Sequence, residues 1–147
     1  MTEADLARVE SELGVSLPAH YREFMLNYPA DFLAASFGPE GEPGEPADFL
    51  LPSEPETLIR VNREARQHLS LQHFSGSLIP WPEHYFVIGR DSGGDHWFIK
   101  LKAESGLSGL VWRYYHEKGM SRVAALSLER YADDLRKLFE KYRRGEW

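Results

Sequence analysis

Two aspartates and a histidine stand close together around a pair of glycines, at Asp91, Asp95 and His96. Carboxylate and imidazole groups can share a proton in acid–base catalysis, or bind a metal ion, when their side chains converge. Aspartate beside glycine is also typical of a turn, in which the carboxylate accepts hydrogen bonds from backbone amides. The spacing departs from the Asp-x-Asp-x-Asp-Gly pattern of a calcium loop. We therefore interpret the cluster as turn chemistry and expect no catalytic residue and no metal ligand in it.

The histidines give little support for a zinc site. His68 and His73 are five positions apart, whereas a zinc-protease helix needs His-Glu-x-x-His with a general-base glutamate between the ligands. His20, His84 and His116 are scattered along the chain and are interpreted as solvated or packed residues. The absence of cysteine excludes thiol nucleophiles, iron–sulfur clusters and cysteine-based zinc sites. No metal or cofactor is expected.

Residues 38–47, GPEGEPGEPA, form the one compositionally biased segment. Its glycines at 38, 41 and 44 superficially resemble a phosphate-binding loop. The segment lacks the Lys-Ser/Thr of a P-loop and the spacing of a dinucleotide fingerprint, and its glutamates would repel phosphate. A segment so rich in glycine, proline and glutamate cannot build a packed core, so it is predicted to be a solvated loop.

The acidic residues of this loop and its flank, Glu40, Glu42, Glu45 and Asp48, are the candidate partner-binding residues. Residues 1–60 carry twelve acidic and three basic side chains, which disfavours nucleic-acid binding and favours a basic partner. Such a surface can steer a basic protein toward its site. A solvated loop with no partner is the alternative, and the sequence leaves both open.

The rest of the chain predicts the elements that would carry these residues. Helices are expected over residues 2–13, from Pro18 to about Tyr28, from a Ser53–Glu56 capping box to about Leu69, and from Ser127 onward. Strands are expected at 85–88, 97–101 and 110–115, with a further strand at 48–51, a strand or buried turn at 32–37 and irregular structure at 70–83. This order predicts one α+β domain, residues 1–147, with an antiparallel meander flanked by N-terminal and C-terminal helices.

Alternation along the third predicted strand separates its side chains into two sets. Trp112 and Tyr114 face one side, and Val111, Arg113 and Tyr115 face the other. Because Arg113 is charged, we expect the face of Trp112 and Tyr114 to be the buried one.

Three stretches of the chain resemble the SUKH superfamily, which includes a fungal cell-wall-synthesis regulator and many bacterial immunity proteins. The opening, residues 9–25 (VESELGVSLPAHYREFM), is similar to the family's acidic helix, Leu-Gly and Leu-Pro connection and aromatic second helix. Residues 86–99 resemble its central hairpin with a Gly-Asp turn, and residues 126–131 (LSLERY) resemble its closing helix. Residues 27–31 (NYPAD) depart from the Asn-Gly-Gly-like turn common in the family, so the identity of a partner does not carry over.

This resemblance implies a curved sheet flanked by helices and a role in binding rather than catalysis. Together with the acidic N-terminal half, it predicts an immunity protein that binds and blocks a cognate bacterial toxin, often a nuclease or a deaminase in that family. A regulatory scaffold linked to cell-wall synthesis is the alternative, and an enzyme would require Asp91, Asp95 and His96 to converge. The polar N-terminus and the lack of a long apolar run predict a cytoplasmic protein that does not enter a membrane. The oligomeric state is left open.

Overall fold

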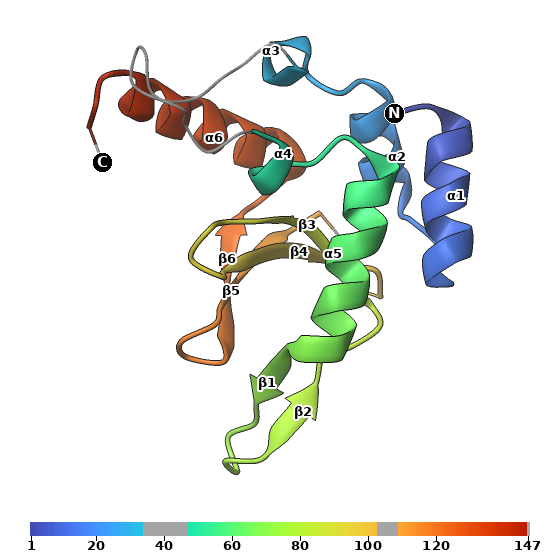
Figure 1. Ribbon diagram of the computed structural model, residues 1–147, viewed down its shortest axis with the longest axis vertical. Coiled ribbons are helices and arrows are strands. Elements are labelled where there is room, and N and C mark those ends of the chain that lie inside the picture. Colours follow the sequence, from blue (N-terminus) through green and yellow to red (C-terminus); the bar gives the residue numbers. More distant parts are fainter. Residues whose placement is uncertain (34–46, 103–108, 147) are drawn as a thin grey trace.

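The computed structural model describes residues 1–33, 47–102 and 109–146, and they form the α+β arrangement that the sequence predicts (Figure 1). The helices are α1 (Glu3–Leu13), α2 (Ala19–Leu26), α3 (Ala30–Leu33), α4 (Ala47–Leu50), α5 (Pro55–His68) and α6 (Leu128–Arg143). The strands are β1 (Ser70–Gln72), β2 (Leu78–Pro80), β3 (Tyr85–Arg90), β4 (His96–Lys100), β5 (Val111–Tyr115) and β6 (Met120–Ala125). Among the described residues, none of the helices combines the length and apolar character that crossing a bilayer requires.

Local signals in the sequence account for the first and last helices. Thr2 and Asp5 form a reciprocal capping box at the start of α1, and Gly14 ends the helix in the left-handed region at φ 65°. At α6, the Ser127 side chain accepts a hydrogen bond of 3.1 Å from the backbone amide of Arg130. These caps satisfy backbone groups that the helix itself leaves unpaired, which is why both boundaries are readable from the sequence.

The main sheet is an antiparallel meander in the order β3-β4-β5-β6. Three of its strands match the predicted ones, and the fourth, β6, was not predicted because its Ser-Arg-Val-Ala-Ala sequence lacks a clear alternation of apolar and polar residues. The prediction of irregular structure at 70–83 was also wrong, because β1 and β2 pair there as a small separate hairpin. Short strands with few β-branched residues give a weak sequence signal.

Two further predictions are corrected by the structure. The segment predicted as a strand at 48–51 contains the short helix α4. Of the segment predicted as a strand or buried turn at 32–37, residues 32 and 33 belong to the short helix α3, and 34–37 lie outside the described residues. The Ser53–Glu56 capping box is absent, because Glu54 occupies the N-cap of α5 without a side-chain hydrogen bond and Pro55 begins the helix. Proline fits the first turn of a helix, where its missing N–H costs nothing.

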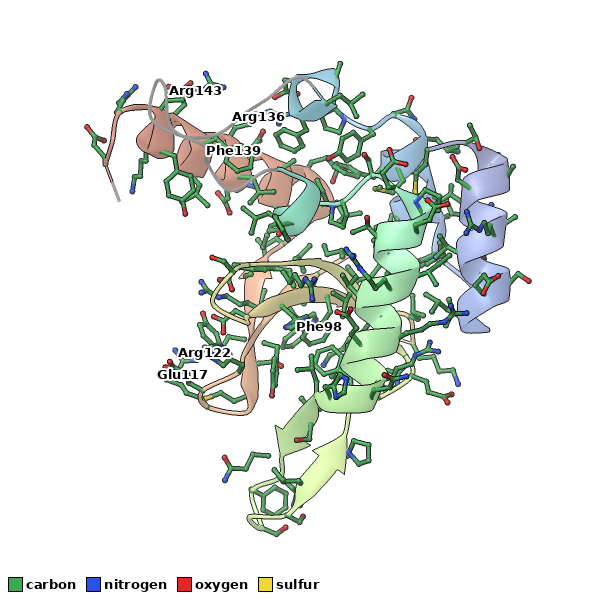
Figure 2. All side chains as sticks on the ribbon, in the orientation of Figure 1. Phe98, Glu117, Arg122, Arg136, Phe139 and Arg143 are labelled. Atoms are coloured by element: carbon green, nitrogen blue, oxygen red, sulfur yellow. The ribbon has the colours of Figure 1, made fainter. Side chains whose placement is uncertain are left out.

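Both faces of the main sheet are covered, each by a separate core cluster. One cluster joins Val111 and its neighbours in the sheet to α1, α2 and α6, and the other joins Tyr114 and Phe98 to Trp81 and the C-terminal half of α5. Figure 2 labels one buried ring of each, Phe139 on α6 and Phe98 beside α5. The expectation that Tyr114 is buried is confirmed, but the expectation of a single buried face is wrong.

Candidate protein-binding surface

The structure places the predicted acidic residues only in part. Glu40, Glu42 and Glu45 lie outside the described residues, and Asp48 lies in α4, where the backbone is described. The surface is therefore built from the two flanks of the acidic segment, which are α3 on one side and α4 with Leu51 on the other.

The N-terminal flank is held on α6 by an ion pair and by an edge-to-face contact between two aromatic rings. Asp31 accepts hydrogen bonds from Arg136, at 2.8 Å from Nε and 3.3 Å from Nη2. The same guanidinium lies 5.0 Å from the ring centroid of Phe32, which packs edge-on against Phe139 at 5.8 Å. Figure 2 shows Arg136 and Phe139 on the part of α6 that approaches α3. The hydrogen bonds from Arg136 hold the pKa of Asp31 below its usual value, so this carboxylate stays charged at neutral pH.

The C-terminal flank is held through its backbone carbonyls. The Tyr131 hydroxyl on α6 donates to the carbonyl of Leu50 at 2.5 Å, and the Tyr28 hydroxyl donates to that of Leu51 at 2.6 Å. β3 lies so close that a Cβ at Gly89 would stand 2.0 Å from the Leu50 oxygen. Glycine is therefore required at this position for α4 to rest on the sheet.

These contacts tie both ends of the acidic segment to one helix. Tyr131 holds the C-terminal flank, and Arg136 and Phe139 hold the N-terminal flank, all from α6. On the same helix, Asp133 and Asp134 are exposed, and Asp133 also accepts a hydrogen bond of 2.8 Å from Arg136. The acidic segment thus begins and ends beside a helix that carries acidic side chains of its own.

The two flanks have the same sequence, Ala-Asp-Phe-Leu, and use it differently. In α3, Phe32 is buried and Leu33 is 68% exposed. In α4, Leu50 is buried and Phe49 is 42% exposed. The neighbouring elements decide which apolar side chain enters the core, since local sequence is identical.

The turn cluster does not assemble in the way an active site would require. Asp91 Oδ1 accepts a hydrogen bond of 2.9 Å from the backbone amide of Asp95, which confirms the turn interpretation. His96 Nδ1 lies 2.8 Å from the carbonyl oxygen of Gly94 instead, and within the described residues no hydrogen bond or ion pair joins it to either aspartate. Burial lowers the pKa of His96, so the ring is neutral at physiological pH.

Asp95 joins two residues that the sequence did not single out together. Its Oδ2 accepts from Arg113 Nε at 3.1 Å and Nη2 at 2.8 Å, and its Oδ1 lies 2.7 Å from His116 Nδ1 and accepts from the His116 backbone amide. Partial burial alone would raise the pKa of Asp95, but the hydrogen bonds from His116 and Arg113 outweigh it and hold the pKa below its usual value. His116 is 21 residues away, and no local motif announces its contact with Asp95. Among the described residues, no group of three or more His, Asp or Glu side chains is arranged to hold a metal ion.

Comparison with known proteins identifies a family for this chain. The model of the SMI1/KNR4 family (SUKH-1) matches residues 1–134 of the 147. No curated protein and no solved structure matches the chain. The matched range runs from α1 into the middle of α6 and includes both flanks of the acidic segment and the whole main sheet. The chain therefore belongs to the SMI1/KNR4 family (SUKH-1).

Proposed function

We propose that this chain is a non-catalytic protein-binding domain that acts in the cytoplasm as an immunity protein, neutralising a cognate bacterial toxin by direct binding. The partner is a basic toxin domain, and the acidic residues Glu40, Glu42, Glu45 and Asp48 draw it to the surface beside α6. A protein partner is favoured over a nucleic acid because phosphate would be repelled by this acidic half of the chain.

The observation that carries the proposal is the attachment of both flanks of the acidic segment to α6. Asp31 and the Leu50 carbonyl are both bound by side chains of that helix, which supports the proposal that the acidic segment between these two flanks acts beside α6. Charges concentrated on one surface create a directional field, which raises the association rate of an oppositely charged partner by about 10–10³-fold. Toxins that cut or modify nucleic acids need positive charge where they hold phosphate, which gives an acidic inhibitor a complementary target.

A regulatory scaffold linked to cell-wall synthesis is the second candidate. Membership in the SMI1/KNR4 family supports it as much as it supports immunity, because the superfamily includes a regulator of that kind. The acidic surface favours the immunity hypothesis over the scaffold hypothesis, because its charge is complementary to that of a basic toxin and gives no reason to expect a cell-wall enzyme.

The first experiment is capture of the full chain with its bound partners from its native cells, followed by mass spectrometry. A stoichiometric protein with a basic toxic domain is the expected result, and cell-wall enzymes would favour the scaffold. The isolated pair then allows association kinetics to be measured from low salt to about 0.3 M.

A charge-matched pair of variants tests the role of the acidic residues. The first variant is Glu40→Gln, Glu42→Gln, Glu45→Gln and Asp48→Asn. The control neutralises four exposed glutamates elsewhere, namely Glu54→Gln, Glu83→Gln, Glu117→Gln and Glu146→Gln. We expect the first variant to associate about tenfold more slowly at low salt, with a flatter salt dependence, because screening acts over a Debye length of about 10 Å at 0.1 M. Equal association rates for the two variants would refute steering by these residues.

A further inference from the structure

The two edges of the main sheet differ in how their backbone groups are paired. At the β3 edge, the buried Asn62 side chain on α5 accepts from the Val87 amide at 2.7 Å and donates to the Val87 carbonyl at 3.0 Å. Beside it, the backbone of Leu50 rests on Gly89. Pairing of an incoming strand with β3 is obstructed there, because Asn62 already bonds both backbone groups of Val87 and the backbone of Leu50 lies against Gly89.

β6, at the other edge, has no comparable cover from Met120 to Ala125 in the part of the chain that the structure describes; the neighbouring element is β1, whose Gln72 amide donates to the carbonyl of Gly119 at 2.9 Å, just before the strand begins. β6 pairs with β5 alone, and Met120 and Val123 are 39% and 43% exposed. The strand contains neither proline nor glycine, and its register with β5 is regular from Met120 to Val123. Figure 1 shows β6 on the side of the sheet away from α1 and α5. Edges with these properties are the usual site at which an extended segment adds to a sheet.

The charge on this edge indicates what kind of segment would fit. Arg122 lies directly opposite Arg113 of β5, and like charges in this position repel each other. Arg113 is compensated by Asp95, whereas Arg122 has no acidic partner among the described residues. Figure 2 shows Arg122 and Glu117 on the same β5–β6 hairpin, and no ion pair joins these two. The edge therefore has an uncompensated positive charge between exposed apolar side chains.

We propose that β6 binds an extended segment of a partner protein as a fifth strand, with an acidic residue of that segment opposite Arg122 and apolar residues beside Met120 and Val123. Backbone hydrogen bonds would supply affinity, and the acidic residue would set the register. A second copy of this chain is the poorer occupant, because pairing through the middle of β6 would bring two Arg122 side chains together. The proposal is independent of toxin neutralisation, since it concerns a different surface from the acidic segment.

Titration of the ¹⁵N-labelled full chain with two blocked seven-residue peptides tests this directly. Both peptides read Thr-Val-Val-X-Val-Val-Thr, which places valine one and two positions from the centre, beside Val123 and Met120; X is glutamate in one peptide and lysine in the other. The glutamate peptide is expected to shift the amide signals of Met120–Ala125 saturably and to slow their hydrogen exchange. We expect the lysine peptide to bind about tenfold more weakly, because it meets Arg122 with a like charge.

The variant Arg122→Glu should reverse this preference, while Arg130→Glu, the same charge change at an exposed position on α6, should leave it unchanged. Unaltered spectra outside the strand would show that the variants fold normally. The proposal is overturned if the glutamate peptide perturbs other elements, if it causes no shifts at millimolar concentration, or if Arg122→Glu keeps the original preference. Self-association through β6, measured by sedimentation, would overturn the assignment of the occupant.

Discussion

Replacing Asn62 with alanine should destabilise the domain far more than the loss of one polar side chain would suggest. Asn62 is 2% exposed. Its side-chain oxygen accepts a hydrogen bond from the backbone amide of Val87. Its side-chain nitrogen donates to the carbonyl of Val87 and, at 2.9 Å, to the carbonyl of Leu58. Each buried backbone group that loses its partner costs about 1–3 kcal/mol. Removing a buried carboxamide recovers part of its own desolvation cost, so the net loss should be about 3 kcal/mol.

Urea unfolding followed by tryptophan fluorescence measures this loss. With a slope of about 1–3 kcal/mol per molar urea, the midpoint should fall by about 1–3 M with little change in slope. Asn27→Ala is the matched control, because its side-chain amide donates to the carbonyl four residues earlier at 2.9 Å in an exposed position. The control should change stability by less than about 0.5 kcal/mol.

A loss below about 1 kcal/mol in Asn62→Ala would refute the view that this side chain closes the β3 edge. Hydrogen exchange gives a second readout. The Val87 amide should lose more protection in the variant than its neighbours in β3, because Asn62 is its direct acceptor. Uniform loss across the sheet would indicate general loosening of the core instead.

Three further changes test other contacts in the fold. Gly89→Ala should cost at least about 3 kcal/mol or prevent folding in a thermal melt, because the new Cβ would stand 2.0 Å from the Leu50 oxygen; a normal melting temperature would contradict this. Tyr131→Phe should cost about 1–2 kcal/mol in urea unfolding, since it removes the donor to that same oxygen. Tyr21→Phe should leave the free energy of unfolding unchanged, because the buried Tyr21 hydroxyl has no hydrogen-bond partner among the described residues. Equal losses of stability in the two tyrosine variants would contradict the stabilising role of the Tyr131 hydrogen bond to Leu50. Asp95 has a native pKa below its unfolded value of about 3.9, so its contribution to stability is present above that value and is lost as pH falls through the native pKa. Asp95→Asn should therefore flatten the acid limb of the stability–pH curve. An unchanged acid limb would argue against the pairing of Asp95 with Arg113 and His116.

Much of the architecture was predictable because it depends on local signals. The caps at Thr2, Gly14 and Ser127 and the periodic apolar residues of α1 and α6 satisfy or bury groups within a few residues of themselves. The β3–β4 hairpin is similarly marked by its aromatic and β-branched runs around a glycine turn. β6 and the β1–β2 hairpin escaped prediction because their pairing partners, and not their own patterns, make them strands.

The candidate site also has features that the sequence predicts and features that only the structure reveals. The acidic composition of residues 38–48 and the family resemblance are properties of the sequence alone, and they lead to a partner of opposite charge. The attachment of both flanks to α6 could not be predicted, because it joins Asp31 to Arg136 across 105 positions and Leu50 to Tyr131 across 81. Such distant contacts carry no local signature.

What the sequence determined by itself is the class of the molecule: an α+β domain of the SMI1/KNR4 family (SUKH-1), acidic in its first half and free of cysteine. Only the tertiary structure decided which side chains are buried and which groups they hydrogen-bond. Asn62 lies among the buried apolar residues of α5, and its side chain hydrogen-bonds the backbone of Val87 at the edge of the sheet. The tetrapeptide Ala-Asp-Phe-Leu buries phenylalanine at Phe32 and leucine at Leu50. The physical reason is that burial and hydrogen bonding depend on which distant surface a residue meets, and that surface exists only once the chain has folded.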